Sequence, residues 1–224
     1  MGIERFEFQA EVGKILNIVA NSLYSDKEIF IREYISNASD ACDKLRYEKI
    51  KDIKLDKIKD DFKIFVTIDK KSNSISIEDN GIGMSKDELV NSLGTIAKSG
   101  TEEFIKKLEQ EKNNNIEQIG KFGVGFYSGF MVADKITVET KKVLSNDSWK
   151  WTSDGKGSFE IESSNHKTNG TKVTLEINKE NKDFLEKVRI ENIIKKYSDH
   201  ISHSVYVSEN TDKKDNQKVN EGNA

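Results

Sequence analysis

The sequence contains no proline and only one cysteine, Cys42, among its 224 residues. A single cysteine excludes an internal disulfide, and its place within a helical pattern suits a small core residue. We therefore expect a reducing, cytoplasmic location. The sequence also lacks any run of about 18 apolar residues, the length that a membrane-spanning helix needs. Its first residues, MGIERFEFQAE, lack the apolar segment of a signal peptide, so we expect neither secretion nor a membrane partner.

A strong charge of either sign is absent too. The formal net charge is -3, from 36 basic and 39 acidic residues. Nucleic-acid-binding domains usually carry a basic surface, so we expect no nucleic-acid partner. Hydrophobic residues make up 35% and charged residues 33% of the chain, a balance typical of globular proteins. The length allows one or two domains with a sizeable core.

The longest predicted helix covers residues 25–50, and no glycine follows it until Gly81. Ser25 and Glu28 have the spacing of a capping box, which predicts the helix start. Beside a broad apolar face, four polar side chains fall within about 60° of one another on the helical wheel. These are Glu33, Asn37, Asp40 and Lys44. The stripe resembles one wall of a polar pocket, although on the helix alone a solvated flank with pairs such as Asp40–Lys44 is the commoner outcome.

Residues 62–79 alternate as a β-hairpin, and this alternation gives Asp79 the same parity as the core-facing Ile75 and Ile77. A buried acid needs a partner, because an unpaired buried charge is costly. The alternative is a turn role, since Asp-Asn-Gly is good turn chemistry. A later strand is expected at residues 171–178. Thr171, at its start, shares the face of the apolar residues that follow it, as Asp79 does in its own strand. The two residues are therefore candidate polar groups on the core side.

The remaining pattern predicts an α+β fold. Helices are expected at residues 11–23, after a second capping box formed by Ser85 and Glu88, at residues 126–132 and through most of residues 184–206. Further strands are expected at residues 135–142, 148–152 and 158–163. Neighbouring strands of this kind favour a two-layer sandwich, with a mixed, mostly antiparallel sheet and helices on one face. His200 and His203 are read as ordinary histidines rather than a metal pair, and residues 208–224 as a polar, disordered tail or linker.

Glycines bracket a long stretch without a strand pattern, residues 94–125, which we interpret as a mobile lid rather than a disordered insertion. Its last part, Gly120-Lys-Phe-Gly-Val-Gly, fits neither the dinucleotide-binding fingerprint nor the P-loop. A glycine loop that leads into a helix at Phe126 can still bind phosphate through backbone N–H groups and the helix dipole. Alone, this signal is weak.

Together the motifs are specific. Glu33-x-x-x-Asn37, Asp79-x-Gly81-x-Gly83, the glycine run and the late Thr171 follow the order of the GHKL superfamily, whose ATP site is the Bergerat fold. The segments YSDKEIFIREYISNASDACDKLRY, EDNGIGM, LGTIAKSGT, IGKFGVGFYSGFMVAD and GTKVTL resemble the heat shock protein 90 chaperones, most of all the bacterial HtpG branch. The resemblance covers about residues 3–207. It implies one N-terminal ATP-binding domain over residues 1–207.

The resemblance also implies the ligands and the role of each site residue. ATP or ADP with Mg²⁺ is the expected cofactor, Glu33 the general base, and Asn37 the metal ligand. Asp79 accepts the adenine amino group, with Thr171 and Gly83 in support. The other nucleotide-contacting residues are Asp40, Lys44, Met84, Asn91, Leu93, Lys98, Gly123, Val124, Gly125 and Phe126. The chain departs from the family pattern at Tyr34 and Ser92, which we expect to lie outside this chemistry.

By the same resemblance, the domain hydrolyses ATP in a molecular chaperone that assists protein folding, with lid closure driving the cycle. Client proteins, the middle and C-terminal domains of the same chain and a homodimer are the implied partners. A middle-domain arginine supplies charge to the γ-phosphate, so the domain alone should hydrolyse slowly. Alternatives are a histidine-kinase-type domain, a DNA-repair or topoisomerase ATPase, and a non-catalytic interaction module. Glu33 argues against a kinase, and the net charge does not favour a DNA-bound enzyme.

Overall fold

A computed structural model describes residues 2–8, 27–94, 125–197, 201–210 and 214–220. Its α-helices are α2 (Ile29–Lys51), α3 (Lys86–Leu93) and α6 (Lys187–Tyr197), and its 3₁₀ helices are η2 (Ile53–Leu55), η3 (Gly125–Met131) and η4 (Lys179–Leu185). The strands are β1 (Glu4–Glu7), β2 (Lys63–Asp69), β3 (Ser74–Asp79), β4 (Ala133–Lys141), β5 (Ser148–Ser153), β6 (Ser158–Ser163), β7 (Gly170–Ile177), β8 (Ser204–Asn210) and β9 (Lys214–Asn220). No helix within these ranges is long and apolar enough to cross a membrane.

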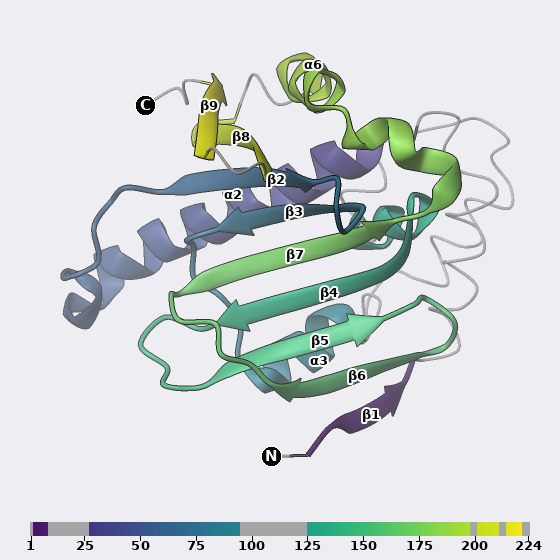
Figure 1. Ribbon diagram of the computed structural model, residues 1–224. Helices are drawn as coiled ribbons and strands as arrows, with labels where there is room; N and C mark the ends of the chain where they lie inside the picture. The colour runs from purple at the N-terminus through teal and green to yellow at the C-terminus, as the bar shows by residue number, and fades with distance from the viewer. Residues whose placement is uncertain (1, 9–26, 95–124, 198–200, 211–213, 221–224) are drawn as a thin grey trace, which may run out of the picture.

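In the described residues the strands form one nine-stranded sheet in the order β1-β6-β5-β4-β7-β3-β2-β8-β9 (Figure 1). All neighbouring strands are antiparallel except β2 and β8, which run parallel. Strand β7 lies between β3 and β4, so the segment around residue 171 reaches the centre of the sheet late in the chain. The predicted mixed, mostly antiparallel sheet is confirmed.

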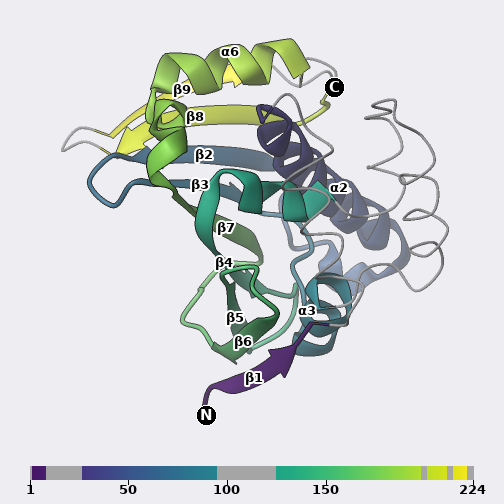
Figure 2. The ribbon, with the colours of Figure 1, turned by 90° about the vertical axis from the view of Figure 1, so that its right-hand side faces the viewer.

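The helices α2 and α3 lie on the same side of the sheet (Figure 2), which confirms the expected layering. The alternating rows of β2 and β3 bury Ile64, Val66, Ile68, Ile75 and Ile77 against the apolar face of α2. The alternating sequence favours strands here, because successive side chains of a strand point to opposite faces. Apolar residues at every second position therefore all face the helix layer. Helix α6 contacts α2, β8 and β9 near one edge of the sheet.

The start of α2 differs from the prediction. The helix begins at Ile29, and Glu28 precedes it without any side-chain cap. The helix therefore begins later than the predicted residue 25. The Glu28 carboxylate lies 3.6 Å from Arg189 and 3.6 Å from Lys196 of α6. Ser25 lies outside the described residues, so the capping box of Ser25 and Glu28 stays a prediction. The second predicted box is confirmed, since the Ser85 side chain accepts from Glu88 N–H and the Glu88 carboxylate accepts from Ser85 N–H.

The C-terminal part also differs. The helix predicted through residue 206 ends at Tyr197, and residues 204–210 form β8. Val205 and Val207 are fully buried beside β2. Apolar residues at every second position are typical of a strand, and this alternation decides the structure here rather than the helical pattern before it. The tail predicted to be disordered from residue 208 is wrong where β8 continues to Asn210 and where β9 pairs with β8. Polar strand residues at a sheet edge gain ladder hydrogen bonds that composition does not reveal.

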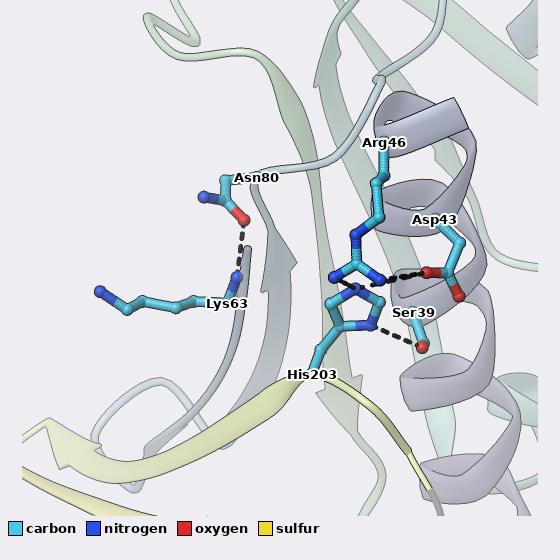
Figure 3. Close-up of polar contacts among 6 residues, drawn as sticks. All are labelled: Ser39, Asp43, Arg46, Lys63, Asn80 and His203. Carbon is cyan, nitrogen blue, oxygen red and sulfur yellow. Dashed lines mark hydrogen bonds and ion pairs between the residues drawn. The ribbon is translucent and has the colours of Figure 1, made fainter. Parts of the chain in front are cut away.

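His203 behaves as an ordinary core histidine (Figure 3). Its Nδ1 lies 2.9 Å from Ser39 Oγ, and its Nε2 lies 3.4 Å from Arg46 Nη2 and 3.5 Å from Asp43 Oδ1. Burial lowers the pKa of His203, and the nearby Asp43 carboxylate opposes that change. His200, the helix predicted at residues 11–23, and nearly all of the lid predicted at residues 94–125 lie outside the described residues.

Candidate functional site

A cavity of about 350 Å³ opens between α2 and the sheet, beside α3 and η3. It has a buried end at the sheet and an exposed end along α2. Its lining residues are Tyr34, Asn37, Ala38, Asp40, Ala41, Lys44, Ile77, Asp79, Ile82, Gly83, Met84, Glu88, Ser92, Leu93, Phe126, Val138, Thr171 and Val173. The lining is mostly apolar with a few polar groups, as expected for a small-molecule site.

Asp79 forms the acidic group at the buried end, with 7% of its surface exposed. Its Oδ1 accepts a 2.8 Å hydrogen bond from Gly81 N–H, and no cation contacts it among the described residues. Burial raises the pKa of Asp79 to about 7, while the backbone N–H groups of Gly81 and Thr171 act in the opposite direction. The inward position predicted by strand alternation is confirmed, and so is the turn contact, since the same carboxylate supports both.

The loop after Asp79 is held on three sides. Ile82 N–H donates to the Ala41 carbonyl of α2 at 3.1 Å, and the Ile82 carbonyl accepts from Val143 N–H at 2.8 Å. Gly83 has φ of +64°, and a Cβ there would lie 1.9 Å from the Lys141 carbonyl oxygen. Only glycine fits both the left-handed backbone and this close approach. The loop therefore presents backbone to the cavity at Gly83 in a fixed position.

Thr171 is the register partner of Asp79 across β7 and β3. Its Oγ1 lies 2.9 Å from Thr140 Oγ1, a buried hydroxyl on β4 that sequence reasoning missed. Thr140 follows the buried Ile136 and Val138 with strand parity, so the signal that identified Asp79 and Thr171 was present for it as well. Asn169 was missed too, and its side chain donates to the Asn80 and Gly81 carbonyls at 3.0 and 2.9 Å.

The exposed end is formed by the polar stripe of α2. Asn37, Asp40 and Lys44 all line the cavity, so the pocket-wall interpretation of this stripe agrees with the geometry better than a wholly solvated flank. Partial burial raises the pKa of Asp40, and the neighbouring Asp43 adds to this effect. The stripe brings an amide, an acid and an amine to the cavity mouth, where charged ligand groups can remain partly hydrated.

Glu33, one turn before Asn37, does not line the cavity. It is 7% exposed, and its Oε1 lies 3.1 Å from Arg32 Nη2. A Cβ on Gly125 would lie 2.2 Å from Glu33 Oε2, so the backbone of η3 covers this carboxylate closely. The next residue, Phe126, lines the cavity, and its carbonyl accepts from Tyr34 Oη at 2.6 Å. Glu33 is thus adjacent to the wall without opening onto the described space.

The other predicted contacts divide into three groups. Met84 and Leu93 line the cavity, whereas Asn91 is exposed and lies outside the lining. Lys98, Gly123 and Val124 lie outside the described residues. Tyr34 and Ser92 both line the cavity. The expectation that these departures from the family pattern lie outside the chemistry stays a prediction. Helix periodicity places Tyr34 three residues before Asn37, which could have indicated its position.

A resident metal held by the protein alone does not fit the described residues, which contain no group of three His, Cys, Asp or Glu side chains suited to one. Asn37, an amide in the cavity lining, is the kind of single oxygen ligand that a largely hydrated Mg²⁺ takes.

Comparison with curated proteins gives several relatives named Chaperone protein HtpG. One from Roseobacter denitrificans is 54% identical over 202 residues, which are 90% of this chain and 32% of that protein. One from Wolbachia pipientis is 50% identical over 205 residues, 90% of this chain and 32% of the relative. One from Paramagnetospirillum magneticum is 46% identical over 224 residues, 100% of this chain and 36% of the relative. The chain spans about a third of the length of these relatives.

A family model described as histidine kinase-, DNA gyrase B- and HSP90-like ATPase matches residues 15–182. The match includes α2, the Asp79 loop, η3 and β7, the elements that surround the cavity. The chain belongs to the histidine kinase-, DNA gyrase B- and HSP90-like ATPase family.

Proposed function

We propose that this chain binds ATP and ADP with Mg²⁺ in the described cavity and hydrolyses ATP as the N-terminal domain of a molecular chaperone. The observation that carries this proposal is the buried Asp79 carboxylate at the closed end of a largely apolar pocket. An acceptor without a cation partner there suits a flat ligand that brings its own N–H donors. Adenine carries such a donor in its exocyclic amino group.

The buried end would hold the base. Asp79 accepts the amino group, Thr171 lies beside it as its register partner, and Gly83 allows close approach of the ring. Met84 and Leu93 provide apolar contacts to the ring faces. We place the base at the buried end because transfer of its apolar ring faces out of water costs little free energy. Its polar edge can form hydrogen bonds with the buried polar groups there.

The exposed end would hold the phosphates. Lys44 brings positive charge to the cavity mouth, and Asn37 offers an amide oxygen to Mg²⁺. When bound, Mg²⁺ would neutralise phosphate charge. Backbone N–H groups of Gly123, Val124, Gly125 and Phe126 would close over the same phosphates, with Lys98 and Asn91 at the border. Asp40 would order solvent at this wall.

Glu33 is the proposed base for the attacking water. Its position one turn from Asn37 and against Gly125 supports this role, since the phosphate-facing loop would meet the carboxylate there. The carboxylate is not part of the described cavity wall, so access would depend on the proposed lid, residues 94–125. Hydrolysis by this domain alone would be slow, because the proposed charge from a middle domain is missing.

The chaperone role rests on the named relatives, which are 46–54% identical to this chain. On the same basis we propose that the protein acts on client proteins, continues into a middle and a C-terminal domain, forms a homodimer and is located in the cytoplasm. A histidine-kinase-type function is less favoured because a kinase does not need the base that Glu33 provides. A DNA-bound ATPase is less favoured by the net charge of -3.

Calorimetry with ADP and Mg²⁺ tests the pocket. We expect wild-type protein to bind and Asp79→Asn to lose at least about a hundredfold in affinity, because the amide turns an N–H group toward donors in the loop and ligand. Glu78→Gln is the matched control, as it removes one charge at the neighbouring, half-buried position on the opposite strand face. Equal affinity of Asp79→Asn and wild type would refute the pocket assignment.

A further inference from the structure

The Thr140 hydroxyl is a fully buried junction of three hydrogen bonds. It lies 3.0 Å from the Gly170 carbonyl oxygen and 2.9 Å from Thr171 Oγ1. It also accepts from Met84 N–H at 3.0 Å. The hydroxyl therefore joins β4, the start of β7 and the loop that follows Asp79.

The donor and acceptor count fixes the direction of these bonds. A threonine hydroxyl has one proton and two lone pairs. A carbonyl can only accept, so the proton of Thr140 goes to Gly170. The lone pairs then accept from Met84 N–H and from the Thr171 hydroxyl. The Thr171 hydroxyl therefore donates its only proton to Thr140 Oγ1.

This direction determines what Thr171 offers to the cavity. With its proton engaged, its oxygen presents lone pairs, beside the carboxylate of its register partner Asp79. Two neighbouring acceptors favour a ligand edge rich in N–H donors and disfavour a carbonyl at the same place, since facing acceptors would lose their hydrogen bonds to water without replacement.

We infer that Thr140, which does not line the cavity, is a positioning residue that sets base specificity by holding the Thr171 hydroxyl as an acceptor. This inference rests on the proposed nucleotide function. Through Met84 N–H, Thr140 also holds the loop that carries Gly83. Its effect on a ligand is therefore indirect, through one side chain and one backbone segment.

The test compares ADP with inosine diphosphate, in which a carbonyl replaces the amino group of the base. Affinities of both are measured by calorimetry for wild type, Thr140→Val, Thr140→Ser and Thr137→Val. Thr137 lies on the same strand but on the opposite, half-exposed face, so Thr137→Val is a matched control. Thermal unfolding is followed for all four proteins.

We expect Thr140→Val to weaken ADP binding by about tenfold, the size of one or two lost hydrogen bonds. We also expect the ratio of ADP to inosine diphosphate affinity to fall by about fivefold or more, because a freed Thr171 hydroxyl can donate to the carbonyl. Thr140→Ser should stay within about twofold of wild type in both quantities, and Thr137→Val should do the same.

A purely structural role for Thr140 would lower the melting temperature and both affinities together, and an unchanged ratio would overturn the inference. If Thr140→Val does not fold, Thr140→Ala removes the same hydroxyl with less bulk, and the ratio is read from that variant. Thr171→Val gives a further check, because it should reduce discrimination and make the added Thr140 change ineffective. Absence of ADP binding by the wild type would instead refute the proposed function.

Discussion

Asp79 and Thr171 are register partners on adjacent antiparallel strands, and both side chains meet at the closed end of one cavity. The carboxylate is buried and accepts from backbone N–H groups rather than from a cation among the described residues. Burial brings the pKa of Asp79 to about 7, so its carboxyl changes protonation near neutral pH. Ligand affinity and fold stability should therefore both depend on pH through Asp79.

Nucleotide affinity should fall on acidification. Burial raises the pKa of Asp79 to about 7, and a ligand amino group needs the unprotonated carboxylate as acceptor. Affinity for ADP should therefore be roughly constant above pH 8 and weaken by up to about tenfold per pH unit below 7. Calorimetry at pH 6, 7 and 8 checks this. Glu78→Gln should show the same decline with its midpoint at a somewhat lower pH, because the Glu78 carboxylate raises the pKa of Asp79. A flat wild-type profile would contradict the assignment.

Asp79→Asn should stabilise the ligand-free protein at alkaline pH. A carboxyl whose folded pKa exceeds its unfolded value of about 3.9 binds more protons in the folded state. Stability is therefore lost as pH rises from about 4 to 7, and the full penalty remains above 7. We expect a gain of roughly 1–4 kcal/mol in unfolding free energy at pH 8 and little gain at pH 4. Urea unfolding at both values measures it, and equal gains at both would exclude a charge effect.

Gly83→Ala should remove nucleotide binding and destabilise the fold by roughly 2–4 kcal/mol. The new methyl would meet the Lys141 carbonyl in addition to the left-handed backbone strain. Gly157→Ala is the matched control, because Gly157 also has positive φ while no atom lies within 4 Å of its Cβ position. Thermal unfolding and calorimetry separate the two. Similar losses in both variants would show that backbone strain alone accounts for the effect.

Glu33→Ala should keep ADP affinity within a few-fold of wild type and stop turnover in the full-length protein. The carboxylate lies outside the cavity lining, so binding does not depend on it, whereas loss of a general base typically costs about 10²–10⁴ in rate. Steady-state ATP hydrolysis measures the change. Glu48→Ala, farther along the same helix, is the control. Persistent turnover would show that another group acts as the base.

His203 should make the fold sensitive to acid. Its pKa is lowered by burial, so the folded state binds fewer protons than the unfolded state, whose value is about 6.5. Stability from this group is present above pH 6.5 and lost as pH falls below it. His203→Gln should flatten the loss of stability between pH 7 and 5, as seen in urea unfolding.

Strand alternation predicted most of the fold because nearly every strand pairs a buried row with a wetter one. The same alternation placed Asp79 and Thr171 on the core side. Thr140 also follows a row of buried residues, so alternation places it on the core side as well. Local sequence patterns predicted the wrong secondary structure where contacts with residues distant in the sequence determine it. Residues 204–206, predicted as part of a helix, belong to β8 because they pair with the edge that β2 leaves.

The sheet order β4-β7-β3 has a consequence for biosynthesis. While the ribosome has released only the first 169 residues, the two strands that flank β7 lack their shared neighbour, and Asp79 lacks Thr171. The closed end of the cavity, where we propose that the base binds, can form completely only after Ile177 has emerged. Nucleotide capture by a nascent chain would thus report that translation has passed the central strand.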